Sequence, residues 1–154
     1  MKILILNAIL ALAPALPPET ADRYSNDIAM AADGDMEMAA ALVATAEGES
    51  HFRVVIERCE CQAWECDRGP DGKVRALGLF QLQYYWWGKH DPKEICADNA
   101  LAAMLTAKEF TYLQKRFGWA QALRYHIGNS ATDQQVRPRL QRFEQLVREW
   151  RNAV

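Results

Sequence analysis

A glutamate at the end of an apolar run is the first candidate for chemistry in this sequence. Residues 36–46 are rich in Ala, Met, Leu and Glu, which favour a helix, and the run ends in Leu-Val-Ala-Thr-Ala at 42–46. Glu49 lies one turn beyond, where the chain must reach the surface. Partial burial disfavours a carboxylate, so we expect the pKa of Glu49 to rise toward the value that a general acid needs near neutral pH. Glu47 competes for this role, and a solvated glutamate at a helix end is the alternative without chemistry.

The second candidate group consists of four cysteines, three of them within eight residues (Cys59, Cys61, Cys66 and Cys96). A structural zinc site usually has two close cysteine pairs, or one pair with two closely spaced histidines. Here a gap of 29 residues precedes the last cysteine, so disulfides are favoured over zinc or free thiols. We expect Cys96 to close a long loop onto the 59–66 segment. The histidines lack ligand spacing, so no metal or other cofactor is expected (His51, His90 and His126).

Three short motifs follow one another along the chain. They are Ala-Glu-Gly-Glu-Ser-His-Phe at 46–52, Arg-Ala-Leu-Gly-Leu-Phe-Gln-Leu at 75–82 and Ala-Leu-Arg-Tyr-His-Ile-Gly at 122–128. In this order they resemble the soluble lytic transglycosylases and goose-type lysozymes of the lysozyme-like superfamily. The resemblance covers roughly residues 36–130. It departs from the family in the third motif, where His126 replaces the usual Asn and Ile127 replaces a small residue.

The resemblance implies a set of site residues. In that superfamily a Glu-Ser pair ends a buried helix, a Gly-Leu-x-Gln-Leu segment lines the sugar cleft, and a loop tyrosine lies beside the glutamate. Glu49 would therefore be the catalytic acid, and four residues would bind substrate (Ser50, Phe80, Gln81 and Tyr125). Helix capping by Ser50 and a core position for Phe80 stay open as alternatives.

The reaction that the resemblance implies is cleavage of the β-1,4 bond between N-acetylmuramic acid and N-acetylglucosamine in peptidoglycan. A lytic transglycosylase uses one carboxyl and forms a 1,6-anhydro product. A hydrolytic lysozyme uses a second carboxylate, for which the segment between the first two motifs offers several candidates (Glu57, Glu60, Glu65, Asp67 and Asp71). A non-catalytic wall-binding or virion structural domain is a third alternative.

Helical periodicity dominates the elements that must position these residues. Apolar residues recur at three- and four-residue spacing in 17–32, 36–46, 94–114 and 134–150. Gly118 is expected to end the third of these helices, and a short helical turn at 119–125 then leads into a loop at 126–130. A Gly-Pro-Asp-Gly turn predicts a short β-hairpin or irregular insert near 53–75. The sequence therefore predicts a mainly-α (α+β) fold, which the resemblance refines to a lysozyme-like helical domain.

The composition is that of an average globular domain. The 154 residues include 18 basic and 20 acidic side chains, and this net charge of −2 argues against a nucleic-acid binder. Residues 17–154 are expected to form one domain. Residues 1–16 are either its first helix or a signal peptide, and they are too short to span a bilayer.

Two further stretches have ordinary structural interpretations. The aromatic run at 84–87 is expected to lie in the core and at its rim rather than on sugar rings, and the arginines of 137–151 on a solvated helix face. We expect a monomer without a stable membrane span that acts on the peptidoglycan glycan strand. Its setting would be secreted, periplasmic or phage-associated.

Overall fold

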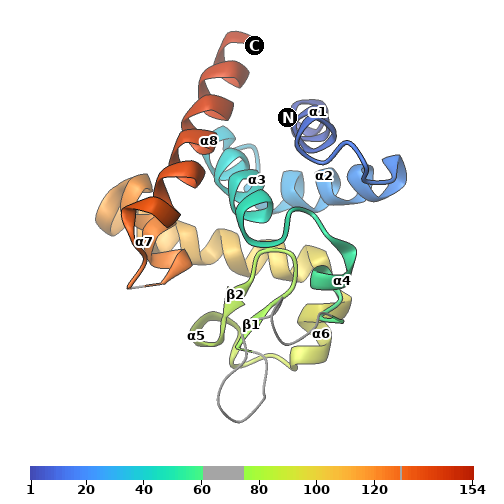
Figure 1. The fold of residues 1–154 in the computed structure, drawn as a ribbon, viewed down its shortest axis with the longest axis vertical. Coiled ribbons are helices and arrows are strands. Elements are labelled where there is room, and N and C mark those ends of the chain that lie inside the picture. The colour runs from blue at the N-terminus through green and yellow to red at the C-terminus, as the bar shows by residue number, and fades with distance from the viewer. Residues whose placement is uncertain (61–74, 129) are drawn as a thin grey trace.

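The computed structural model describes residues 1–60, 75–128 and 130–154, and it is mainly helical with one small antiparallel sheet (Figure 1). This confirms the predicted fold class. The described elements are α1 (Lys2–Leu12), α2 (Pro18–Ala32), α3 (Met36–Ser50), α4 (Val54–Glu57), β1 (Ala76–Leu77), β2 (Leu82–Gln83), α5 (Tyr84–Trp87), α6 (Pro92–Ala97), α7 (Asn99–Ile127) and α8 (Asp133–Asn152).

Helix α3 lies at the centre of the fold, between α8 and α2 (Figure 1). Every residue from Met38 to Ala46 is buried, and five of these nine positions are alanine. Such small side chains let helices α1, α2, α7 and α8 all pack against the same helix. The start of α3 is fixed by its N-cap residue Asp35, whose Oδ1 accepts hydrogen bonds from the backbone amides of Glu37 (2.9 Å) and Met38 (3.0 Å). This cap fixes where α3 begins, and the helix ends at Ser50, one residue after Glu49.

The hairpin is short and follows the predicted insert. Ala76 lies opposite Gln83, and Leu77 opposite Leu82. The predicted range 53–75 instead contains helix α4, and residues 61–74 lie outside the described residues. Cys61 and Cys66 are among these, as are three of the predicted acid candidates (Glu65, Asp67 and Asp71).

Helix α7 bends at Gly118, whose backbone angles (φ 76°, ψ 170°) leave the helical region. Only glycine adopts a positive φ at little cost, so this residue ends the first half of α7 as predicted. The second half continues to Ile127. The loop predicted for 126–130 is therefore wrong for residues 126 and 127, because the helix extends through them.

Helix α8 packs against α3 and buries the apolar face that its periodicity predicts (Val136, Phe143, Val147 and Trp150). Helix α1 packs against α2 and α3, with Ile5 and Ile9 fully buried. None of the helices in residues 1–60, 75–128 and 130–154 combines the length and apolar character that a membrane crossing requires.

A disulfide joins Cys59, just after α4, to Cys96 in α6. It confirms the expected closure of a long loop from Cys96 onto the 59–66 segment. The two cysteines are 37 residues apart in sequence, so the cross-link removes much of the freedom of the unfolded chain. A loop of this length corresponds to about 4 kcal/mol in the chain-entropy description.

Removing this cross-link should therefore destabilise the protein. For the double variant Cys59→Ala with Cys96→Ala, we expect the free energy of unfolding in urea to fall by about 2–4 kcal/mol. Reduced wild-type protein is the control and should unfold at a similar denaturant concentration. A loss below about 1 kcal/mol would show that the unfolded chain is already constrained in another way.

Candidate active site

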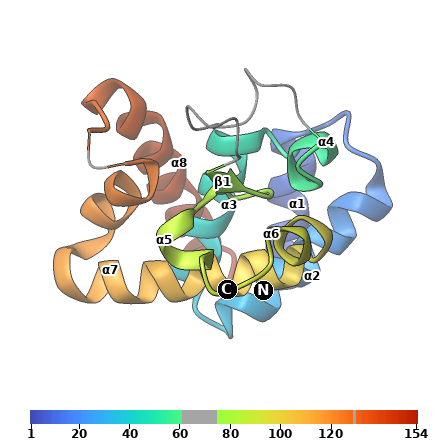
Figure 2. The ribbon, with the colours of Figure 1, turned by 90° about the horizontal axis from the view of Figure 1, so that it is seen from below.

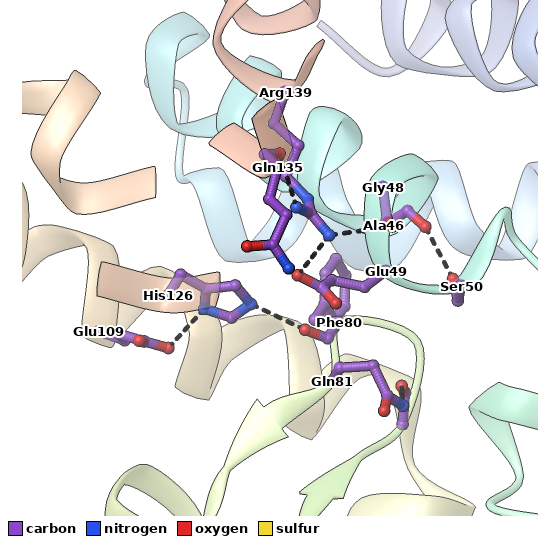
Figure 3. A network of polar contacts seen from close by, with 11 residues as sticks. Ala46, Gly48, Glu49, Ser50, Phe80, Gln81, Glu109, His126, Gln135 and Arg139 are labelled. Atoms are coloured by element: carbon purple, nitrogen blue, oxygen red, sulfur yellow. Dashed lines mark hydrogen bonds and ion pairs between the residues drawn. The ribbon is translucent and has the colours of Figure 1, made fainter. Parts of the chain in front are cut away.

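Glu49 lies in the last turn of α3, and its side chain is only 17% exposed. Its Oε1 atom is 2.8 Å from Nη2 of Arg139, which reaches it from α8 (Figure 3). Burial raises the pKa of Glu49 above its usual value, against the opposing effect of the positive charges on His126 and Arg139. The structure therefore places an acid of raised pKa at the predicted position.

The side chain of Arg139 lies close against the backbone of α3 at Gly48. Its Nη2 atom donates to the carbonyl of Gly48 at 3.0 Å, and its Nη1 atom donates to the carbonyl of Gln135 at 3.2 Å. A Cβ atom at position 48 would lie 2.3 Å from Nε and 2.9 Å from Cγ of Arg139. A side chain at position 48 would therefore displace Arg139 from its present path to Glu49.

Glu49 faces a cavity of about 600 Å³ between α3, α8 and the hairpin. Gln81 and Gln83 border it from the hairpin, and Glu47 borders it beside Glu49. Helix α8 contributes several polar side chains to the same wall (Gln134, Gln135, Arg139 and Arg142). A concave site that combines apolar surface with several side-chain amides suits a ligand with hydroxyl and amide groups.

His126 and Glu109 form a buried pair behind Glu49 (Figure 3). Nε2 of His126 is 2.8 Å from the carbonyl oxygen of Phe80, which can only accept, so this nitrogen carries a proton. Nδ1 is 2.9 Å from Oε2 of Glu109. Burial disfavours the imidazolium, but the carboxylates of Glu109 and Glu49 more than compensate, and the pKa of His126 rises to about 9. At neutral pH, His126 is therefore a buried cation.

This pair connects three parts of the chain. Glu109 belongs to the first half of α7, His126 to the second half beyond Gly118, and Phe80 to the turn between β1 and β2. The hydrogen bonds therefore hold the bend of α7 and the hairpin turn in one arrangement. That turn includes Gln81, which borders the cavity of Glu49.

Two of the predicted site residues meet at this cavity, Glu49 and Gln81. The Nε2 atom of Gln81 donates to the carbonyl of Gly78 at 3.0 Å, which fixes its side chain within the turn. Ser50 is fully buried. Its Oγ donates to the carbonyl of Ala46 at 2.7 Å and accepts from the amide of Phe52 at 3.2 Å, so it secures the helix end and points away from solvent.

The structure does not bring Phe80 and Tyr125 into this cavity. The Phe80 side chain is fully buried in the core, because the turn directs it inward, and no surface of it is accessible to a sugar. Only its carbonyl serves the site, through His126. Tyr125 lies in helix α7, in line with the helical turn predicted for 119–125 and not in the loop that the resemblance implies, and it borders a neighbouring cavity with Phe117.

The other carboxylates that the sequence offered for the reaction bind other residues. Glu47 accepts two hydrogen bonds from Arg142, from Nε at 2.8 Å and from Nη2 at 3.2 Å. Glu57 is buried and pairs with Nη1 and Nη2 of Arg23, and it accepts from the hydroxyl of Tyr24 at 2.9 Å. Glu57 and Glu60 border a different cavity, beside α6.

Arg139 and Glu109 are the site residues that the periodicity analysis missed. Arg139 follows the buried Val136 by three residues and precedes the buried Phe143 by four, so it stands within the apolar stripe of α8. Glu109 likewise precedes the buried Leu113 by four. A charged side chain at a buried position needs an oppositely charged or hydrogen-bonding partner. The positions of Arg139 and Glu109 within apolar stripes could therefore have indicated a buried polar site.

No protein-family model, no curated protein and no solved structure matches this chain significantly. Function must therefore be inferred from the geometry above and from the three motifs. In the part of the chain that the structure describes, no group of three or more His, Cys, Asp or Glu side chains is placed to hold a metal ion.

The close approach of Gly48 and Arg139 leads to a stability prediction. Alanine is about 1 kcal/mol better than glycine inside a helix. With Arg139 present, we expect Gly48→Ala to destabilise the protein or leave it unchanged, because the new Cβ displaces the arginine. With Arg139→Ala already made, the same change should stabilise by up to about 1 kcal/mol. Equal effects in the two backgrounds, measured by urea unfolding, would contradict the contact.

The buried His126–Glu109 pair predicts a pH dependence of stability. The pKa of His126 is about 9 in the folded protein and near 6.5 when unfolded, so between these values the native state holds one more proton. The free energy of unfolding should fall by at most about 1.4 kcal/mol per pH unit across this window. The stabilisation is complete below about pH 6.5 and is lost as the pH rises through about 9.

A double variant isolates this contribution. His126→Gln with Glu109→Gln keeps side chains of similar size and polarity but does not titrate, so its stability should vary less between pH 6.5 and 9. The free energy of unfolding of both proteins should be measured in urea at several pH values. An equal dependence of this free energy on pH in the two proteins would contradict a charged His126.

Proposed function

We propose that this protein is a peptidoglycan-cleaving enzyme, a lytic transglycosylase in which Glu49 acts as general acid and then as base. The observation that carries the proposal is the environment of Glu49: a largely buried carboxyl of raised pKa that faces an open cavity with amide and charged side chains in its wall. Glu47, which borders the same cavity, is bound by Arg142. Chemistry that needs a single carboxyl of raised pKa fits this arrangement.

The reaction begins with proton transfer from Glu49 to the glycosidic oxygen, O4 of N-acetylglucosamine. The bond between this oxygen and C1 of N-acetylmuramic acid breaks, and the N-acetylglucosamine end leaves with its O4 hydroxyl. The Glu49 carboxylate then takes the proton of the muramic acid 6-hydroxyl while O6 bonds to C1. This gives the 1,6-anhydro product, consumes no water, and returns Glu49 to its protonated form.

The surrounding cations support the first step. Arg139 and the buried His126 both favour the ionised form of Glu49, while burial favours the protonated form. Loss of the proton therefore produces a carboxylate that already has an arginine at 2.8 Å. This arrangement stabilises the charge that develops as the glycosidic oxygen is protonated.

The disulfide and the cavity both support peptidoglycan as the proposed substrate. Disulfides persist in oxidising compartments, which for a bacterial system means outside the cytoplasm. Peptidoglycan lies there, so we assign the protein to a secreted, periplasmic or phage-associated setting. The amide-rich wall of the cavity would bind the N-acetyl and hydroxyl groups of the glycan strand.

The decisive variant is Glu49→Gln, which keeps the size of the side chain and removes its acid. We expect at least a hundredfold loss in the rate of muropeptide release from purified peptidoglycan, because general acid catalysis contributes roughly that much or more. Glu47→Gln is the matched control on the same helix turn and should keep most of the activity. Release should be followed by mass spectrometry.

Three results would contradict the proposal. Equal activity of Glu49→Gln and wild type would remove Glu49 as the acid. Products without 1,6-anhydro ends would identify a hydrolase with water as the acceptor. The absence of any release by wild-type protein would favour a non-catalytic wall-binding or virion structural domain.

A further inference from the structure

The turn that joins β1 to β2 has an unusual backbone conformation at Gln81, which borders the cavity of Glu49. The φ angle of Gln81 is 48°, in the left-handed region that residues other than glycine seldom occupy. Gly78, at the start of the turn, also has a positive φ (70°), which costs a glycine little. At Gln81 a positive φ opposes the preference of the residue itself, so contacts with the rest of the protein must hold it.

The peptide unit between Phe80 and Gln81 is held at both of its polar groups. Its oxygen, the carbonyl of Phe80, accepts from Nε2 of His126 at 2.8 Å (Figure 3). Its N–H, the amide of Gln81, donates to the carbonyl of Gly78 at 3.1 Å. A flip of this peptide unit is the simplest route by which Gln81 would reach a negative φ, and the flip would break both hydrogen bonds. The donor on His126 therefore opposes it.

The surroundings of His126 keep this donor in place. Nδ1 faces Oε2 of Glu109 at 2.9 Å, and Nε2 faces the carbonyl of Phe80. Both partners are acceptors, so the ring satisfies both only as an imidazolium with a proton on each nitrogen. The charges that favour this form are the carboxylates of Glu109, in the first half of α7, and Glu49, at the end of α3. Arg139 of α8 is paired with Glu49.

We infer that His126 is a positioning residue of the candidate site: through the carbonyl of Phe80 it holds the left-handed conformation of Gln81 at the wall of the cavity. The hairpin lies beside α7 (Figure 2), and the donor comes from the second half of this helix, beyond the bend at Gly118. At position 126 the sequence departs from the lysozyme-like motif, so the resemblance does not supply this role. The effect on turnover rests on the proposed function, whereas the arrangement of the turn does not.

The test compares two double variants that are both uncharged at the two positions. The leucine pair, His126→Leu with Glu109→Leu, removes the donor and leaves no buried charge unpaired. The glutamine pair, His126→Gln with Glu109→Gln, keeps a side-chain amide that can donate to the carbonyl of Phe80. Both pairs remove the cation near Glu49. They therefore change its electrostatic surroundings in the same direction and differ in the donor to the turn.

The first measurement is hydrogen exchange of the Gln81 amide by NMR, which reports the orientation of the peptide unit independently of any activity. We expect the leucine pair to speed this exchange at least about tenfold, because a buried carbonyl without a donor is costly. The glutamine pair should change it less than about threefold. The control is the amide of Asp35, which follows the left-handed Asp33 and donates to the carbonyl of Ala32 at 2.9 Å. Its exchange should stay near the wild-type rate in both pairs.

The second measurement is muropeptide release, for which we expect kcat/KM of the leucine pair to lie at least about tenfold below that of the glutamine pair. If the leucine pair does not fold, the corresponding methionine pair takes its place, because methionine fits irregular space in a core. Equal exchange of the Gln81 amide in the two folded pairs would overturn the inference, as would unequal exchange with equal kcat/KM. A wild-type protein that releases no muropeptides would contradict the proposed function, and the exchange result would then decide the inference by itself.

Discussion

The burial of helix α3 on all sides is the constraint from which the site follows. Residues 38–46 carry no charged side chain, and four other helices pack around them. The helix continues for one more turn beyond this run, so Glu49 stays within the packed interior instead of reaching bulk water. A carboxylate is costly in such surroundings, and either protonation or a cation must reduce that cost.

In this structure both effects act on Glu49: its protonated form is favoured by burial, and two cations lie near it. Arg139 approaches from α8 and passes the helix where Gly48 leaves room. His126 approaches from α7 and is kept charged by Glu109. Burial still prevails in the pKa of Glu49, which is raised. If this proton passes to a substrate atom, as proposed, the carboxylate left behind lies 2.8 Å from a guanidinium nitrogen of Arg139.

Ion pairs also join the helices that form the walls of the cavity. Arg142 of α8 binds Glu47 of α3, and Arg139 of α8 binds Glu49, two residues further along α3. The arginines at 139 and 142 were expected on a solvated face, but they lie against α3. The side chain of Arg139 passes close to Gly48 of α3, and the guanidinium groups of both arginines pair with its glutamates.

The sequence predicted the long helices because their apolar residues repeat at helical spacing over many turns, as in 17–32 and 134–150. Strands β1 and β2 contain two residues each, too few to produce an alternating pattern, so the hairpin was expected in the preceding segment. Glu49 was predicted from the apolar run that precedes it together with the order of the three motifs, and both signals can be read from the sequence.

The roles of Tyr125 and His126 could not be predicted in the same way. Successive residues of a helix point about 100° apart, so their directions depend on whether the helix continues past them. It does continue, to Ile127, which turns His126 into the core and Tyr125 toward the neighbouring cavity that Phe117 also borders. The fold of the whole domain, and not the local motif, determines which of the two faces Glu49.

The most direct test of this account is an NMR titration of the Glu49 side-chain carboxyl in the wild-type protein, with the signal assigned by its disappearance in Glu49→Gln. The account predicts a pKa above the ordinary glutamate value of 4.5. A pKa at or below 4.5 would show that Arg139 and His126 prevail over burial, and would contradict Glu49 as a proton donor near neutral pH.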